Sequence, residues 1–267
     1  MTPFASDIRF QWRLQVLEVT ATGDLQKVPL PGLEAEVIFC VRGLLSPLLS
    51  NLVLDELDRE LERRGLRFVR YADDCNIYVR SQRAGQRVME SVKRFITEKL
   101  KLKVNEAKSA VARPQARKFL GFSITDGPSF RRRIAPQAIT RFKERIREIT
   151  QYARSVRLET TMAKLAPYMK GWRSYFGFCE TPGTLVKLTS WVRRRLRCAV
   201  WQQWQTPRRR WAALIQLGVR ADLARLAASS GHGPWRLSRS TAVHAGLSNE
   251  YFRVRGFPSL AGTGSRN

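Results

Sequence analysis

The feature that most constrains the fold is a pair of adjacent aspartates, Asp73 and Asp74, between two runs of β-branched and aromatic residues. The runs 68–71 and 75–79 have the composition of short strands, so the stretch predicts a β-hairpin with acid at its turn. Adjacent carboxylates oppose each other's ionisation, and a divalent cation or full exposure to water relieves that cost. A hard cation such as Mg²⁺ prefers oxygen ligands, and paired metal ions stabilise the oxygens of a phosphoryl transfer. The hairpin therefore predicts either a metal site or a solvated polar turn.

Charge is the dominant fact of the composition. The 267 residues carry 48 Lys/Arg against 22 Asp/Glu, a net charge of +26. The excess grows along the chain, from +6 over 1–125 (21 against 15) to +7 over 126–180 (12 against 5) and +13 over 181–267 (15 against 2). Because neutralised phosphates release counterions, this balance favours a nucleic-acid partner. The asymmetry suits a metal site in front and a nucleic-acid platform behind it.

Several other classes of protein are disfavoured. No run reaches the roughly 18 apolar residues of a membrane span, and the N-terminus lacks the apolar core of a signal peptide, so a cytoplasmic protein without membrane contact is expected. Only His232 and His244 are available for histidine chemistry. The cysteines lie at 40, 75, 179 and 198, without the spacing of a zinc or redox motif, and are predicted to be free thiols.

The order of predicted elements changes near residues 126–134. Before that point, a helix over 46–65 and another over 82–100 flank the hairpin, and a strand over 118–124 follows. Beyond it, only a short basic strand precedes a series of helices, predicted at 136–154, 161–168, 171–178 and 185–204. This order predicts an α+β layer followed by a helical domain. Residues 1–42 show no long period and are compatible with two or three short strands.

Seven arginines are interleaved with four tryptophans between 191 and 211. Arginine pairs with phosphate and aromatic rings stack on unpaired bases, so the segment is a candidate RNA-binding face. Because so few acids are present to pair with them, the arginines are predicted to contact RNA, whereas the large apolar area of the tryptophans favours core packing. The arginines concerned are Arg193, Arg194, Arg195, Arg197, Arg208, Arg209 and Arg210.

Several stretches together resemble the bacterial group II intron-encoded reverse transcriptases and maturases. Tyr71-Ala72-Asp73-Asp74 between two strands is similar to the polymerase box of reverse transcriptases. The stretches follow the family's order: 46–51 (SPLLSN), 67–74 (RFVRYADD), 105–109 (NEAKS), 119–122 (FLGF), 168–177 (YMKGWRSYFG) and 191–235. The resemblance covers about four-fifths of the chain, and six motifs in order make it specific.

The resemblance implies a partial reverse-transcriptase palm over 43–125 and an α-helical thumb/maturase (X) domain over 126–260. It leaves 1–42 as a segment outside the family fold and 261–267 as a disordered tail. Asp73 and Asp74 would be catalytic and would ligate Mg²⁺, and Lys108 would lie near the incoming triphosphate. Intron RNA is the implied partner, with a DNA target or primer beside it. Phe119, Leu120 and Gly121 would form the strand that holds the primer end.

Two departures from the family pattern limit the expected activity. The palm of such enzymes carries a further aspartate on an upstream strand, which Asp7-Ile8-Arg9-Phe10 imitates only loosely, and 41–45 lacks the Pro-Gln-Gly loop. We therefore expect an N-terminally truncated copy that is deficient as a polymerase. Three functions remain open: an RNA-directed DNA polymerase, a maturase remnant that only binds and stabilises intron RNA, and a decayed fragment without function.

Overall fold

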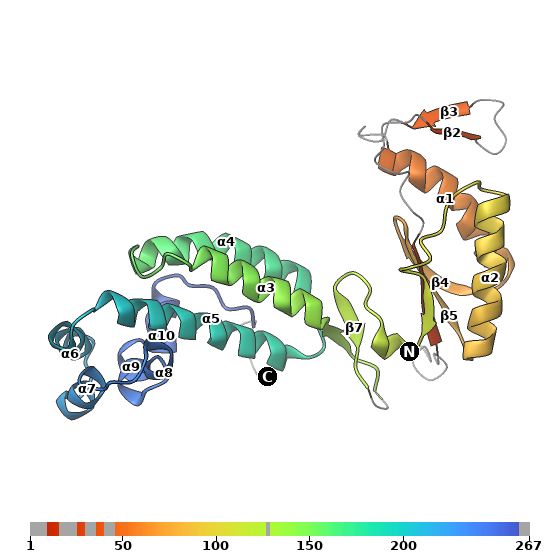
Figure 1. The fold of residues 1–267 in the computed structure, drawn as a ribbon. Coiled ribbons are helices and arrows are strands. Elements are labelled where there is room, and N and C mark those ends of the chain that lie inside the picture. Colours follow the sequence, from red (N-terminus) through yellow and green to blue (C-terminus); the bar gives the residue numbers. More distant parts are fainter. Residues whose placement is uncertain (1–9, 16–25, 30–35, 40–45, 127–128, 262–267) are drawn as a thin grey trace. The chain divides into compact units, whose positions relative to one another are not determined.

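The computed structural model describes residues 10–15, 26–29, 36–39, 46–126 and 129–261, and the chain divides into two compact units (Figure 1). Unit 1 comprises Met1–Phe119 and Ser123–Phe130, and unit 2 comprises Leu120–Phe122 and Arg131–Asn267. The mixture of many helices and small sheets is compatible with the predicted α+β class. Among the described residues, no helix combines the length and the apolar character that a membrane span requires.

Unit 1 is built around a four-stranded antiparallel sheet with the order β4-β5-β1-β6. The predicted hairpin is confirmed as β4 (Arg67–Tyr71) and β5 (Asp74–Val79). β1 (Phe10–Gln15) pairs with β5 on one side and with β6 (Ala110–Ala112) on the other. Residues 10–15, which belong to the segment expected to lie outside the family fold, thus supply an inner strand that pairs with β5 along its whole length. β4 remains an edge strand.

A second, separate pair of strands precedes the first helix. β2 (Gln26–Pro29) and β3 (Glu36–Phe39) form an antiparallel two-stranded sheet. Together with β1 they agree with the two or three short strands that the sequence of residues 1–42 allows. The Asp7 side of the Asp7–Phe10 motif lies outside the described residues.

Two helices, α1 (Ser46–Arg63) and α2 (Gln82–Glu98), form the core of unit 1 with β5. The side chains alternate along β5, so Cys75 and Ile77 enter the helix-facing core while Asp74 and Asn76 belong to the other face. Gly65, in the left-handed conformation (φ 65°), follows the end of α1. The remaining members of this core are Leu54, Leu57, Leu61, Val92, Ile96 and Leu100.

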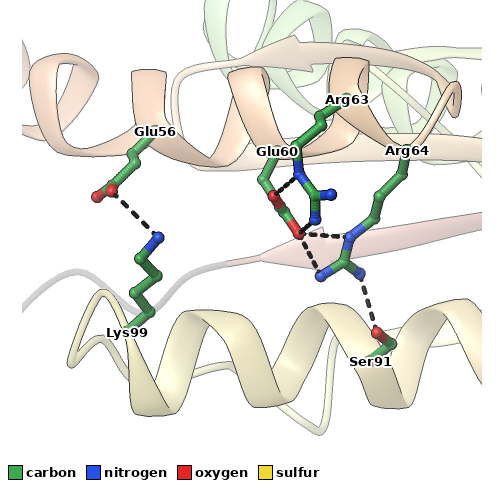
Figure 2. Close-up of polar contacts among 6 residues, drawn as sticks. All are labelled: Glu56, Glu60, Arg63, Arg64, Ser91 and Lys99. Atoms are coloured by element: carbon green, nitrogen blue, oxygen red, sulfur yellow. Dashed lines mark hydrogen bonds and ion pairs between the residues drawn. The ribbon is translucent and has the colours of Figure 1, made fainter.

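Polar contacts join the two helices at their exposed edge (Figure 2). The carboxylate of Glu60 accepts hydrogen bonds from Arg63 (2.8 and 2.7 Å) and from Arg64 (2.7 Å), all on α1. Arg64 also donates to the hydroxyl of Ser91 on α2 at 2.9 Å. The hydrogen bond from Arg63, followed by those from Arg64, lowers the pKa of Glu60 to about 2. Glu60 thus orients Arg64 toward α2.

Unit 2 consists mostly of helices around one apolar core. Buried aromatic side chains from distant parts of the sequence meet there, including Phe142, Trp201 and Phe252, each fully buried. The helices are α3 (Pro136–Ile149), α4 (Leu158–Phe176), α5 (Pro182–Gln203), α6 (Pro207–Gln216), α7 (Ala221–Ala228), α8 (Pro234–Leu237), α9 (Thr241–Gly246) and α10 (Asn249–Val254).

The prediction of two separate helices over 161–168 and 171–178 is wrong, because α4 runs continuously through Pro167. Pro167 is exposed, so its ring does not enter the core. Leu165, Met169, Trp172 and Phe176 form an unbroken buried stripe across the proline. Burial of this stripe outweighs the hydrogen bond that proline removes.

Candidate functional site

The acidic turn is a two-residue connection. Tyr71 pairs with Asp74, so Ala72 and Asp73 alone link the strands. Ala72 adopts a left-handed conformation (φ 52°), which costs a residue with a Cβ roughly 1–2 kcal/mol. Asp73 and Asp74 are both partly exposed. The turn therefore presents two neighbouring carboxylates at the rim of the sheet at the expense of local backbone strain.

Arg70, on β4, ties this turn to helix α1. Its Nε and Nη2 donate to the carboxylate of Asp58 at 2.8 and 2.6 Å. Its Nη1 donates to Asn51 Oδ1 at 2.9 Å and to the carbonyl oxygen of Ala72 at 3.0 Å. One guanidinium thus forms hydrogen bonds with a carbonyl oxygen of the turn and with two residues of α1. Sequence reasoning missed this role, although a basic residue before the acidic pair was visible.

Asn76 is a second residue that the sequence did not single out. Asn76 lies two residues after Asp74 and therefore on the same face of β5. It is fully buried, and neither its amide nitrogen nor its amide oxygen has a hydrogen-bond partner among the described residues. Buried side-chain amides are ordinarily hydrogen-bonded, so the Asn76 amide is an exception on the face of β5 that carries Asp74.

The donor set suits a hard cation but is small. Carboxylate oxygens are the ligands that Mg²⁺ prefers, and Asp73 and Asp74 supply them from one turn. Within the described part of the chain, no cluster of three or more His, Cys, Asp or Glu could hold a metal ion. The end of β1 nearest the turn is Gln15, which pairs with Asp74, whereas Phe10 pairs with Val79 at the far end of β5. Phe10, the one described residue of the Asp7–Phe10 motif, therefore lies at the end of β1 away from the acidic turn.

Lys108 is not brought to the acidic turn by any ion pair among the described residues. It lies exposed in the turn before β6, where its backbone N–H donates to Asn105. In the sheet, β1 separates β6 from β5. Its role near a triphosphate stays a prediction.

The predicted primer-holding strand through Phe119, Leu120 and Gly121 is wrong as secondary structure. Leu120 (φ 49°) and Gly121 (φ 77°) both adopt left-handed conformations, which a strand does not allow, and strand β7 begins only at Phe122 (Phe122–Ile124). The turn packs on the end of α4. Tyr175 donates its hydroxyl to the carbonyl oxygen of Leu120 at 3.0 Å. A Cβ at Gly121 would meet the ring of Phe176 at 3.0 Å, which explains the glycine.

Three arginines of α5 have partners inside unit 2, whereas Arg193 is half-buried and its Nε has no hydrogen-bond partner among the described residues. Arg197 is only 2% exposed, and its Nε donates to the carbonyl oxygen of Leu247 at 2.7 Å. Arg195 donates to the hydroxyl of Thr150 at 2.8 and 3.0 Å. Arg194 donates to the carbonyl oxygen of Trp235 at 2.9 Å. These guanidiniums connect α5 to the other helices, so their first role is structural.

Arg208 and Arg209 differ from the arginines of α5. Both are exposed in the first turn of α6, and neither side chain has a hydrogen bond or an ion pair within the described chain. Trp211, next on the same helix, is 43% exposed. Arg210 instead lies over the ring of the buried Trp201, 4.9 Å from its centroid. Among the seven predicted RNA-binding arginines, Arg208 and Arg209 are thus exposed on α6 without a side-chain hydrogen bond or ion pair within the described residues.

The tryptophans divide between core and surface. Trp201 is fully buried, as the sequence predicted, whereas Trp191 is half-buried with Lys143, Arg147 and Arg195 each within 6 Å of its ring centroid. Trp235 is 40% exposed beneath Arg194. Core packing therefore explains only part of the tryptophan content.

Two protein-family models match the chain. Residues 43–124 match a model described as reverse transcriptase (RNA-dependent DNA polymerase), a region that runs from α1 to β7. Residues 139–214 match a model described as group II intron, maturase-specific domain, which runs from α3 into α6. A comparison with curated proteins gave no match.

Proposed function

This chain belongs to the family of group II intron reverse transcriptases and maturases, and from that premise we propose that it works chiefly by binding structured intron RNA through unit 2. In this proposal unit 1 is the partial palm (43–125) and the helices of unit 2 are the thumb/maturase domain (126–260). The observation that carries the proposal is the uncompensated positive charge of the maturase-like region.

The charge balance of that region leaves most cations without a carboxylate. Residues 131–267 hold 27 Lys/Arg against 6 Asp/Glu, a net of +21. Four of the six acids are already paired with an arginine, namely Glu148, Glu180, Asp222 and Glu250. Surplus positive charge of this size favours a polyanion, since binding releases its counterions.

Exposed aromatic rings among these cations favour RNA with unpaired bases over duplex DNA. Tyr152 (68% exposed), Phe178 (70%) and Trp211 (43%) lie on the surface of unit 2. Bases in loops and bulges can stack on such rings, whereas bases inside a duplex cannot. Trp211 beside Arg208 and Arg209 offers both kinds of contact on one helix, so α6 is the proposed contact surface.

The proposal is tested on the full chain by measuring the affinity for a folded intron RNA domain and for duplex DNA of equal length over a range of salt. We expect preference for the RNA and a steep slope of log K against log salt. The double variant Arg208→Gln/Arg209→Gln should flatten that slope by about 1.5, because each lost phosphate contact removes roughly 0.7–0.9. The control, Arg83→Gln/Arg87→Gln on α2, removes the same charge from exposed sites of unit 1.

Two outcomes would contradict the proposal. Equal affinity for RNA and DNA would reduce unit 2 to a nonspecific cation. Equal losses in the α6 and α2 variants would show that total charge, rather than α6, governs binding.

An RNA-directed DNA polymerase activity is the second candidate, favoured by the hairpin alone. In it Asp73 and Asp74 would hold Mg²⁺, Lys108 would steady the triphosphate, and the orphaned amide of Asn76 would face the same side as Asp74. The metal would supply electrostatic stabilisation of the phosphoryl oxygens. The small donor set places this candidate second.

A further inference from the structure

A basic pocket in unit 2 has no assigned role. Its volume is about 350 Å³, and α5 supplies one wall through Trp191, Arg194 and Arg197. Arg239, which follows α8, and His244 on α9 also line the pocket. Hydroxyl and amide groups complete the lining, and no lining residue is acidic.

The guanidinium of Arg197, which lines the pocket, is held by uncharged partners. Arg197 donates Nε to the carbonyl oxygen of Leu247 at 2.7 Å and Nη2 to Asn249 Oδ1 at 3.1 Å. Both acceptors are uncharged, and in the described chain no hydrogen bond uses Nη1. Because burying a charge without a counter-charge costs free energy, an anion in this cavity would stabilise the 2% exposed guanidinium.

Of the other three basic residues in the pocket, one is oriented by its neighbours and two make no hydrogen bond or ion pair within the described residues. Arg194 donates to the carbonyl oxygen of Trp235 at 2.9 Å and stacks 3.9 Å from that ring's centroid, so its position is set by its neighbours. Arg239 and His244 are exposed, and neither side chain has a hydrogen bond or ion pair within the described residues. Two preset guanidiniums and two free donors thus converge on one cavity.

The pKa shifts of two pocket residues agree with this geometry. Burial, and then Arg193, lowers the pKa of Arg197 to about 10. Burial, Arg197 and Arg239 lower the pKa of His244 below its ordinary 6.5. Each group is therefore destabilised in its charged form by its neighbours, and an anion would relieve that cost.

We propose that this pocket binds a backbone phosphate of the RNA, with Arg194, Arg197, Arg239 and His244 as its ligands. The inference rests on the proposed RNA-binding function and adds a defined contact to it. Guanidiniums bind phosphate oxygens through paired N–H donors, and the indole of Trp191 offers an apolar wall to the adjoining sugar or base. Arg197 would contact the phosphate through the guanidinium edge that its protein acceptors leave open.

The two histidines of the chain allow a direct test. His244 lines the pocket, and His232 is exposed elsewhere in unit 2, so His232 serves as an internal reference. The imidazole signals of the full chain are followed by NMR against pH, alone, with inorganic phosphate and with folded RNA, and are assigned with His244→Gln. RNA is expected to raise the pKa of His244 toward or above 6.5 and to leave His232 nearly unchanged.

A pair of variants gives an independent measure. Arg239→Gln removes a pocket charge that makes no hydrogen bond or ion pair with the described residues, and Arg225→Gln removes a charge that is also exposed, on α7 outside the pocket. Arg239→Gln should weaken RNA binding roughly five- to tenfold at near-physiological salt and flatten the salt slope by about 0.7–0.9. Arg225→Gln should weaken it no more than about twofold.

The possible results separate the pocket from the proposed function. RNA binding with an unmoved His244 signal, or equal losses in the two variants, overturns the pocket and leaves RNA binding intact. A response of His244 to inorganic phosphate without any response to RNA assigns the pocket to a free phosphate compound and overturns the RNA contact. Failure of the wild-type chain to bind RNA overturns the proposed function, and phosphate moving both histidines alike then overturns the pocket as well.

Discussion

Arg70 and Asp58 form a bidentate ion pair, with guanidinium nitrogens 2.8 and 2.6 Å from the carboxylate oxygens. The same guanidinium donates to the carbonyl oxygen of Ala72, whose left-handed conformation makes the acidic turn possible. A side chain of the strand before the turn thus fixes the turn to helix α1. The placement of Asp73 and Asp74 therefore depends on a contact between distant segments of the sequence.

This contact should be measurable as coupling between the two residues. In a double-mutant cycle with Arg70→Gln and Asp58→Asn, we expect a coupling free energy of about 1–2 kcal/mol, because both side chains are largely shielded (14% and 23% exposed). The neighbouring pair Arg59 and Asp55 is the control, since it is 78% and 50% exposed. The coupling free energy of this control pair should be below about 0.5 kcal/mol. Equal coupling in the two cycles would show that the Arg70–Asp58 pair is no stronger than an exposed pair and would contradict its role in fixing the turn to α1.

Removing the guanidinium of Arg197 should destabilise unit 2. Arg197→Ala leaves the carbonyl oxygen of Leu247 and the amide of Asn249 without their donor inside the fold. We expect a loss of about 2–4 kcal/mol in the free energy of unfolding, measured by denaturant titration. Arg208→Ala, at an exposed position, should change it by less than about 0.5 kcal/mol. An Arg197→Ala variant as stable as the wild type would contradict the structural role.

The acidic hairpin should not support DNA synthesis by itself. The purified chain is expected to show no measurable primer extension on an RNA template with Mg²⁺, because the described residues bring no third carboxylate to Asp73 and Asp74. Primer-extension gels provide the measurement. Processive synthesis that Asp73→Asn abolishes would contradict this expectation and would assign the missing ligand to another part of the chain.

Glu60 should contribute stability that acid removes. Its folded pKa of about 2 lies below the ordinary 4.5, so the contribution is complete above 4.5 and is lost as the pH falls toward 2. Glu60→Gln should therefore lower the unfolding temperature at pH 7, and the difference from wild type should shrink on acidification through this window. Glu62→Gln is the control on the same helix, and equal pH profiles for the two variants would argue against the Arg63 and Arg64 contacts.

Cys75 should be chemically inert in the folded protein. Burial raises the pKa of its thiol to about 12, and the side chain is 1% exposed between the sheet and the helices. Alkylation at pH 8, followed by peptide mass spectrometry, should label Cys75 only at the rate at which unit 1 opens. Labelling of Cys75 as fast as the half-exposed Cys198 would contradict the packing of β5 against α1 and α2.

The elements predicted correctly are those that local chemistry specifies. The hairpin follows from two short β-prone runs, and α1 follows from its apolar spacing of four and from Gly65 at its end. These signals act over a few residues and need no partner. The family resemblance, carried by short motifs, was equally readable from the chain alone and is confirmed by the two family models.

Tertiary structure decided what depends on neighbours distant in sequence. β1 lies between β5 and β6 because its backbone groups pair with two strands that are far along the chain. No local sequence pattern predicts such pairing. Leu120 and Gly121 turn instead of extending because Tyr175 and Phe176 pack against them. Arg197, which was predicted from the sequence to contact RNA, is buried, and Leu247 and Asn249 supply its acceptors. The residue type determines the charge of a side chain, but the folded structure determines its solvation and its partners.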